Sequence, residues 1–550
     1  MAAVFCRINI QSVIMLDLIH KTIFLKENKM GKSEIIMLIA IVLYMAFMIG
    51  VGVFYSKKNN STDDFYLGGR KLGPLVTAMS AEASDMSGWL LMGLPGLAYL
   101  CGTAEAAWTA IGLAVGTYFN WLIVAKRMRV YSAKTGSITV PDFFKDRYRD
   151  KSKLLVTISA IVIIVFFVPY TASGFSACGK LFSTLFGADY HVAMILSAAI
   201  IIAYTVIGGF FAASVTDLVQ SVVMSIALIV VLLFGVSKAG GFGAVINNAT
   251  SISDYISLTS FKNLFTGNVS SYGFLPIVST LAWGLGYFGM PHILVRFMAI
   301  EDVRKLKISR RVGTVWVVIS MFVAIFIGIV GLGMVENGAL ASLTANASSA
   351  TEAASKSETI IVAIATLLSK NGILAAFIGG IIIAGILAST MSTADSQLLV
   401  ASSSVSENIV KGHFVKHMSA KTQMWIARAT VAVIAAVAVL LAWNPNSSVF
   451  RIVSFAWAGF GAAFGPVVIA SLFWRRSNKW GALAGMLSGG ITVFVWKFLI
   501  RPLGGAWDIY ELLPAFVVSC IFIVAVSLLT SSPEKEIEEV YDAVKVSVKE

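Results

Sequence analysis

The stretch Ala83-Ser84-Asp85-Met86-Ser87-Gly88-Trp89, followed by Gly93-Leu94-Pro95-Gly96, places small, polar and acidic residues inside an otherwise apolar run over residues 74–100. A carboxylate at the centre of a bilayer costs about 2.5–3.5 kcal/mol even on a lenient insertion scale, so an intramembrane acid normally faces a cavity or an ion pathway. Close helix packing through Gly and Ser is the alternative explanation. Asp85 therefore favours a functional site within an interrupted membrane helix.

The composition of the whole chain agrees with a membrane location. Hydrophobic residues make up 57% of the 550 residues and charged residues only 13%, whereas charged residues are about 25% of an ordinary globular protein. A span needs about 20 apolar residues. Thirteen runs are long enough: 34–56, 74–100, 104–125, 153–179, 189–209, 215–236, 273–295, 312–335, 372–408, 424–443, 449–474, 480–500 and 508–530. The sequence predicts an all-α polytopic membrane protein with about 13 transmembrane helices.

The distribution of Lys and Arg predicts the orientation of these helices. Connections after spans 1, 3, 5, 7, 9 and 11, together with the C-terminal tail, hold 28 of these residues, and the opposite side holds 8. Cytoplasmic connections carry the excess of positive charge. The N-terminus is therefore predicted to lie outside and the C-terminus inside.

A second interruption occurs in span 7, where Gly284-Leu285-Gly286-Tyr287-Phe288-Gly289-Met290-Pro291 breaks the apolar run. It follows the interruption of span 2 by five spans. Because five is odd, a second copy of a five-helix unit enters the membrane upside down, so spans 2–6 and 7–11 are predicted to form an inverted repeat. Broken helices at corresponding positions of two such halves mark the substrate site of a secondary transporter.

Span 9 adds a cluster of hydroxyl groups in the middle of a helix. Ser389, Ser392 and Thr393 share one helical face through their i, i+3, i+4 spacing. Back-bonding of these hydroxyls to the preceding turn is one explanation. A hard cation instead needs several neutral oxygens held together. Carbonyl groups from span 2 and hydroxyl groups from span 9 are predicted to form a sodium site.

These segments also carry a family resemblance. Gly68-Gly69-Arg70 with Pro74, the 83–96 string, Trp283 to Gly289 with Pro291-His292, and the Ser392-Thr393 pair resemble the sodium:solute symporter family over about residues 34–531. The 83–96 and 283–289 strings favour its proline-transporting branch. The resemblance implies a leucine-transporter-type fold, uptake of L-proline driven by inward Na⁺ flux through alternating access, and a bacterial plasma membrane. It implies neither an organic cofactor nor an enzymatic activity.

The resemblance also implies roles for individual residues. Those expected at the sodium site are Ala83, Met86 and Ser389 through backbone oxygens, Ser392 and Thr393 through hydroxyls, and Asp85. Those expected at the substrate site are Ser87, Gly88, Trp89, Tyr170, Trp283, Tyr287 and Pro291. Arg70 and Asp217 match positions near the inner mouth that serve ion coupling and release. The alternatives are a positive-inside anchor for Arg70 and a solvated helix end for Asp217.

Chemistry independent of the family supports proline, and some alternatives stay open. The faces of Trp283 and Tyr287 suit the apolar ring and its ammonium, with a cation–π contact worth about 2 kcal/mol when desolvated. Glu82 and Asp395 depart from the family pattern and leave a second ion site open. Other sodium-coupled solutes (pantothenate, another amino acid or a carboxylate) and a non-transporting membrane sensor are the competing functions.

The remaining features define the domain limits and exclude some classes of function. Residues 1–33 are predicted to be an N-terminal extension, with Met30 a candidate translation start, followed by the transmembrane domain 34–531 and a cytoplasmic tail 532–550. The net charge of +13 lies mainly in short connections, so no nucleic-acid binding is expected. The five histidines form no HExxH motif and no GxSxG occurs, which argues against an intramembrane enzyme. We expect lipid as the surroundings and a monomer as the functional unit.

Overall fold

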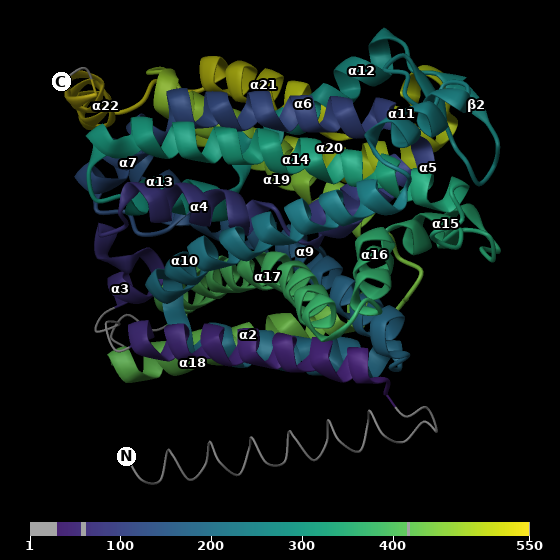
Figure 1. The fold of residues 1–550 in the computed structure, drawn as a ribbon. Coiled ribbons are helices and arrows are strands. Elements are labelled where there is room, and N and C mark those ends of the chain that lie inside the picture. Colours follow the sequence, from purple (N-terminus) through teal and green to yellow (C-terminus); the bar gives the residue numbers. More distant parts are fainter. Residues whose placement is uncertain (1–29, 57–61, 415–418, 549–550) are drawn as a thin grey trace, which may run out of the picture.

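The computed structural model describes residues 30–56, 62–414 and 419–548, and it confirms the all-helical membrane architecture (Figure 1). Most long helices run along one common direction, as α2, α6, α10, α14 and α17 show. The strands of the described part of the chain form one antiparallel hairpin, β1 (Ser260–Lys262) with β2 (Val269–Ser271), at one end of the molecule. The predicted extension 1–33 lies almost entirely outside the described residues.

The thirteen predicted runs all coincide with helical segments. Within the described residues, nine segments are long and apolar enough to cross a membrane. The other four predicted runs contain shorter apolar helices, and one further short helix, Ile360–Ser369, was not predicted. The number of membrane crossings and the orientation of the termini stay predictions.

The first half of the molecule comprises the outer helix α2 and the five predicted spans that follow it. Its helices are α2 (Lys32–Ser56), α3 (Thr62–Leu67), η1 (Gly68–Arg70), α4 (Pro74–Asp85), η2 (Trp89–Gly93), α5 (Leu94–Cys101), α6 (Thr103–Phe119), η3 (Asn120–Val124), α7 (Ala125–Thr135), α8 (Val140–Arg147), α9 (Leu154–Phe186) and α10 (Tyr190–Lys238). α10 contains two predicted spans, and Gly209, with φ 68°, breaks it between them. This left-handed conformation is one that glycine adopts without strain.

The rest of the chain comprises α11, the β-hairpin and the second half proper, which begins at α12. Its helices are α11 (Phe242–Ser251), α12 (Phe274–Leu281), η4 (Ala282–Gly289), α13 (Pro291–Ala299), η5 (Val303–Lys305), α14 (Leu306–Glu336), α15 (Ala350–Ser357), α16 (Ile360–Ser369), α17 (Ile373–Ser403), η6 (Ser404–Phe414), α18 (Ala420–Leu441), α19 (Val449–Phe473), α20 (Lys479–Val495), η7 (Trp496–Ile500), η8 (Arg501–Leu503), η9 (Gly505–Trp507), α21 (Leu512–Leu529) and α22 (Lys535–Ser547). α17 lies in the middle of the molecule and packs against α2, α4, α9 and α10.

The first predicted break is confirmed in span 2. α4 ends at Asp85, and Met86 leaves the helical conformation with φ −78° and ψ 67°. The Ser87 N–H donates to the Asp85 carbonyl at 2.8 Å rather than to the carbonyl of Ala83 four residues earlier. A new helical segment then begins at Trp89. The break leaves backbone oxygens inside the protein without their usual helical hydrogen-bond partners.

The second predicted break is confirmed in span 7. A 3₁₀ segment, η4, replaces the α-helix over Ala282–Gly289, Met290 is extended, and Pro291 starts α13. The backbone of α19 lies very close to this segment, because a Cβ on Gly289 would lie 2.2 Å from the carbonyl oxygen of Phe460. Only glycine permits that approach, which holds the broken helix against α19.

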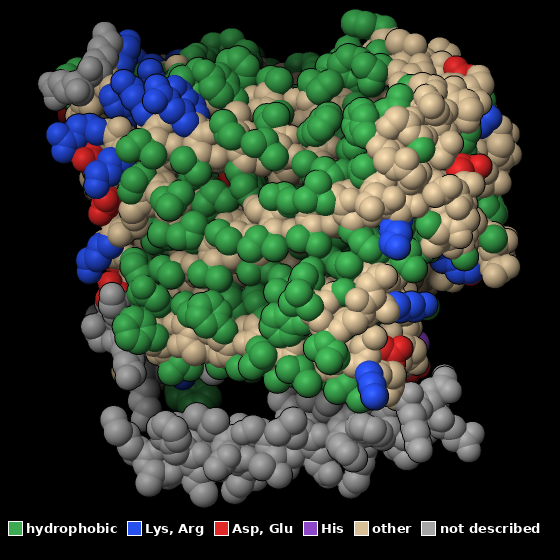
Figure 2. Space-filling view, viewed as in Figure 1, with side chains coloured by type: hydrophobic (Ala, Val, Ile, Leu, Met, Phe, Trp, Pro, Cys, Tyr) green, Lys and Arg blue, Asp and Glu red, His purple; other side chains and the backbone are tan. Residues whose placement is uncertain are grey.

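The outer surface matches the predicted surroundings. Figure 2 shows hydrophobic side chains across one face of the molecule and a group of Lys and Arg side chains near the end where α14 begins. The tail contributes to that end: α22 packs against α7, with Ile537, Tyr541 and Val544 buried. An apolar belt with basic residues at one end is typical of a protein held in a bilayer.

Candidate sodium and substrate sites

Four of the six residues predicted for the sodium site converge between α4 and α17. The Ser392 hydroxyl donates to the carbonyl of Ala83 at 2.7 Å and to that of Ser389 at 3.2 Å, and the Thr393 hydroxyl donates to Ser389 at 3.1 Å. The Ala83 carbonyl is available because the break at Met86 removes its helical partner. All four groups are buried neutral oxygens, the ligand type that a hard cation takes.

Met86, another residue of the predicted sodium set, lies at the break itself. Its N–H donates to Glu82 at 2.8 Å, so it still closes the last turn of α4. The N–H of Leu90, which would bond the Met86 carbonyl in a continuous helix, donates to Ser87 at 3.0 Å instead. The Met86 carbonyl is thus outside the helical hydrogen-bond pattern, which leaves its lone pairs available to a cation.

Asp85 joins the two broken helices. Its carboxylate Oδ2 accepts a hydrogen bond of 2.6 Å from the Tyr287 hydroxyl, and its carbonyl accepts from the Tyr170 hydroxyl at 3.2 Å and the Trp89 indole at 3.0 Å. The other carboxylate oxygen, Oδ1, is buried without a hydrogen-bond partner among the described residues. A buried unpaired carboxylate oxygen is costly. It marks a place suited to a cation or to the ammonium of a substrate.

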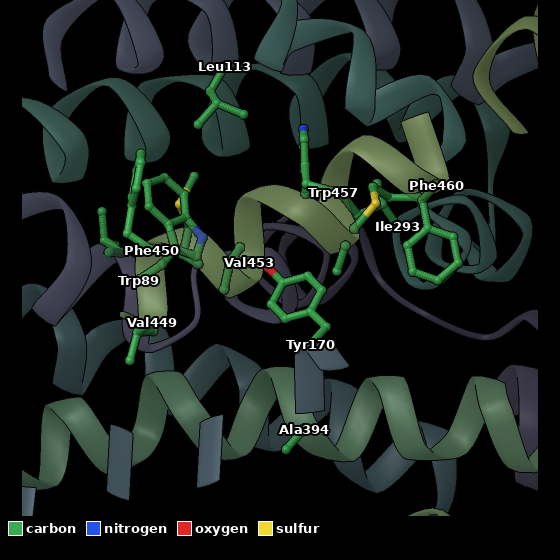
Figure 3. Close-up of a cluster of buried hydrophobic side chains, with 14 of the residues drawn as sticks. Trp89, Leu113, Tyr170, Ile293, Ala394, Val449, Phe450, Val453, Trp457 and Phe460 are labelled. Carbon is green, nitrogen blue, oxygen red and sulfur yellow. The ribbon is translucent and has the colours of Figure 1, made fainter. Parts of the chain in front are cut away.

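An aromatic wall surrounds Trp283. Its ring stacks on Tyr510 with centroids 5.1 Å apart and lies 5.4 Å from Phe450 and 6.3 Å from Trp89. The indole of Trp457 donates to the Trp283 carbonyl at 2.7 Å and fixes the 3₁₀ segment. Figure 3 shows Trp89 beside Phe450, with Tyr170 lying between that region and the helix that carries Ala394. Phe450, Trp457 and Tyr510 were not among the predicted site residues.

Residues of both predicted sites line one narrow crevice, which has no room for a water molecule. It is lined by Ser87, Tyr170, Thr171, Ser173, Gly174, Thr390, Thr393, Ala394 and Gln397. Ser87 and Tyr170 belong to the predicted substrate set and Thr393 to the predicted sodium set. Gly88 lies against the same helices, because a Cβ there would be 3.0 Å from the Cβ of Ala177 and 3.4 Å from the Thr390 hydroxyl. The sodium and substrate residues therefore form one continuous region.

Asp217 lies in a buried polar cluster, which excludes the alternative of a solvated helix end. Its Oδ2 accepts from the Ser80 hydroxyl at 2.6 Å and from Arg296 at 3.1 Å. Arg296 also donates to Ser80 at 2.8 Å and to Ser396 at 2.5 Å. The Ser396 hydroxyl in turn donates to Asp395 at 3.1 Å. The cluster therefore joins α4, α10, α13 and α17.

Arg296 is the functional candidate that the sequence analysis missed. It was assigned to the basic connection after span 7, whereas the structure buries it completely in α13. A signal was present: Glu82, Asp85, Asp217 and Asp395 all fall within predicted spans, and buried charges are paired. An arginine only one turn beyond Pro291-His292 is a natural partner for one of those acids.

The two carboxylates outside the family pattern occupy different places. Asp395 belongs to the Arg296 cluster, whereas Glu82 faces α6 and accepts from the Trp121 indole at 2.7 Å and the Thr117 hydroxyl at 3.0 Å. Glu82 is therefore satisfied on one oxygen by groups outside the predicted sodium site. Of these two acids, Asp395 lies nearer in sequence to the hydroxyls of Ser392 and Thr393.

Arg70 and Asp217 are not brought together. Arg70 has a positive φ of 57° and donates to the carbonyls of Ser132, Ser137 and Met298 at 2.7–3.0 Å. These contacts tie the α3–α4 connection to α7 and to the end of α13. Arg70 thus fixes the C-terminal end of α13, the second part of the broken span 7. This role is more specific than that of an interfacial anchor.

Known proteins share much of this sequence. The sodium:solute symporter family matches residues 65–489. A sodium/proline symporter of Haemophilus influenzae is 43% identical over 517 residues, covering 93% of this chain and 98% of that protein. A sodium/proline symporter of Escherichia coli is 41% identical over 504 residues, covering 92% and 95%.

A solved structure shows the same fold. The substrate-bound, outward-open state of a Na⁺-coupled sialic acid symporter superposes with a TM-score of 0.74 at 18% identity, covering 91% of this chain and 98% of that one. At that identity the likeness concerns the arrangement of helices alone. With the family match extending over most of the sequence, this chain belongs to the sodium:solute symporter family.

Proposed function

We propose that this protein couples inward flux of Na⁺ to uptake of L-proline by alternating access across the bacterial plasma membrane. One observation carries the proposal: the segment 83–89 supplies a carbonyl to the α17 hydroxyls and a carboxylate to Tyr287 of the second broken helix. Ion ligands and substrate-facing residues thus lie within seven residues of one interrupted helix. The names of the relatives, sodium/proline symporters at 41–43% identity, support this choice of ion and solute.

Sodium binding would tie α4 to α17. The hydroxyls of Ser392 and Thr393 donate to carbonyls in this structure. Rotation about the C–O bond directs a hydroxyl lone pair, instead of its hydrogen, toward a cation, while the Ala83, Met86 and Ser389 carbonyls keep their positions. The ion then replaces the hydrogen bond between the two helices with ion–dipole contacts to several oxygens, and this strengthens their association.

Proline would bind between the two broken helices. Its apolar ring suits the faces of Trp283 and Tyr287, and its secondary ammonium suits the unpaired Asp85 Oδ1 and the aromatic faces. Its carboxylate suits the N-terminal ends of the helical segments that begin at Trp89 and Pro291. Ser87, Gly88 and Tyr170 complete this pocket. No positively charged side chain is required.

Coupling follows from the shared segment. An ion that orders residues 83–86 also places Asp85, so the ion and the solute stabilise the same conformation of α4. Two ligands coupled in this way raise each other's affinity by the same factor. Arg70 and the Asp217–Arg296 pair then hold the inner ends of the broken helices and act in opening and release. Both ligand sets lie within one chain, so we propose that a monomer is the functional unit.

Radiolabelled proline uptake into proteoliposomes tests the proposal. An inward sodium gradient is expected to drive accumulation, and its removal is expected to abolish it. Equal accumulation with a proton gradient alone contradicts sodium coupling. Sodium-driven uptake of pantothenate or another solute without proline contradicts the substrate, and sodium-dependent binding without any uptake supports a sensor instead.

A further inference from the structure

A large apolar groove lies on the lipid-facing side of the molecule, away from the ion and substrate residues. Its volume is about 580 Å³, and α10 and α14 form its walls. Ser225, Leu228 and Ile229 line it from α10, and Met79 lines it from α4. This volume falls in the range of roughly 300–1,000 Å³ of small-molecule sites. The groove is therefore large enough for a specific ligand.

The length of the groove matches one leaflet of a bilayer. It follows α14 from Arg311 to Val323, a distance of about 18 Å at 1.5 Å per residue. Half of a hydrocarbon core of about 30 Å is roughly 15 Å. Val315 and Ile319 between these ends are more than half exposed and face the membrane. An acyl chain lying along α14 fits both the length and the polarity of this groove.

The positive charge at one end of the groove favours an anionic lipid headgroup. Arg311 lines the groove at the end where α14 begins, and Lys307 and Arg310 lie within one turn of it. The two acids before this helix are already engaged, since Glu301 pairs with Lys305 at 2.6 Å and Asp302 with Arg304 at 2.9 Å. Across the described ranges no carboxylate lies within 4.0 Å of Arg311.

We propose that this groove binds an anionic glycerophospholipid of the leaflet at the basic end of the molecule, with an acyl chain along α14 and the phosphate on Arg311. Basic pockets between membrane helices on the cytoplasmic side are suited to such headgroups. The indole of Trp316, which donates to Ser225 at 2.9 Å, joins the two walls of the groove. A chain in the groove also contacts Met79, which precedes Ser80 of the Arg296 cluster.

Native mass spectrometry of the full-length protein tests this site. Protein released from nanodiscs of phosphatidylethanolamine with phosphatidylglycerol is expected to retain one phosphatidylglycerol. The Arg311→Gln variant is expected to bind it about fivefold more weakly, the effect of one basic contact near a membrane surface, and Arg311→Lys is expected to stay close to the parent. Arg304→Gln is the matched control, because Arg304 is exposed and pairs with Asp302 outside the groove.

A second variant examines the acyl chain rather than the headgroup. Val315→Trp fills the groove from an exposed position and is expected to reduce retention without loss of folding. Equal retention of phosphatidylglycerol in Arg311→Gln, Val315→Trp and the parent overturns the proposal. Equal retention of phosphatidylethanolamine and phosphatidylglycerol by the parent overturns the selection of an anionic headgroup. None of these outcomes depends on which solute the protein carries.

Discussion

The guanidinium of Arg296 lies 3.1 Å from the carboxylate of Asp217, and both side chains are fully buried. Ser80 bridges them, since it donates to Asp217 and accepts from Arg296. The pair thereby connects the first half of one broken helix to the second half of the other through α10. A movement of either broken helix has to move or break this connection.

Removing one partner of the pair is expected to destabilise the protein strongly. Arg296→Gln leaves Asp217 buried without its counter-charge, which typically costs about 3–5 kcal/mol. Arg296→Gln combined with Asp217→Asn is expected to recover part of that loss, because Asp217 is then neutral and only Asp395 of the same cluster stays without the arginine. Thermal unfolding of the purified variants measures both effects. Arg304→Gln, which breaks an exposed pair, serves as the control with an expected change below about 1 kcal/mol. Additive losses in the double variant contradict a direct pair.

The hydroxyls of Ser392 and Thr393 are expected to set the sodium affinity. Thr393→Ala removes a proposed ligand, and the sodium concentration for half-maximal proline uptake is expected to rise at least about tenfold, because a contact to a charged group is worth about 1.5–3 kcal/mol. Thr393→Ser retains the oxygen and is expected to show a smaller rise. Ser403→Ala is the control, since this buried hydroxyl of α17 bonds, among the described residues, only to the carbonyl of Val400. Unchanged sodium dependence in Thr393→Ala removes this residue from the site.

Asp85 and Trp283 are expected to fail in different ways. Asp85→Asn keeps the size of the side chain and loses its charge, so sodium affinity is expected to fall and proline affinity with it. Trp283→Ala is expected to lower proline affinity about tenfold or more through loss of the aromatic face, while sodium binding without proline persists. Calorimetry with each ligand alone measures the two affinities, and Trp283→Phe guards against a folding defect. Identical sodium affinity in both variants and the parent places the cation elsewhere, with Asp395 and Glu82 the next candidates.

The glycines of the first broken helix are expected to differ in tolerance. A Cβ on Gly96 would lie 2.7 Å from backbone atoms of Glu358. Backbone atoms cannot move aside as the end of a flexible side chain can. Gly96→Ala is therefore expected to destabilise the protein by about 1–3 kcal/mol. Gly73→Ala is the control, because nothing lies within 4 Å of its Cβ position. Equal thermal stability of the two variants would show that the contact between α5 and Glu358 rearranges at little cost in free energy.

The sequence alone determined the class of protein and the position of both breaks. Runs of apolar residues reveal membrane helices because lipid accepts little else, and an acid or a Gly-Pro cluster inside such a run stands out against that background. The hydroxyl face of span 9 was readable from helical periodicity for the same reason. Ala83, Ser389, Ser392 and Thr393 were predicted on these grounds and on the resemblance, and the structure brings them together.

Only the tertiary structure decided which distant groups meet. Arg296 reads as one more basic residue in a cytoplasmic connection, because a one-dimensional charge pattern contains no information about the depth at which α13 begins. Phe450, Trp457 and Tyr510 read as ordinary lipid-facing or packing residues, since nothing in their own runs distinguishes an aromatic ring that faces Trp283 from one that faces lipid. Pairing across hundreds of residues depends on how α10, α13, α17 and α19 pack, and a local sequence pattern does not specify that packing.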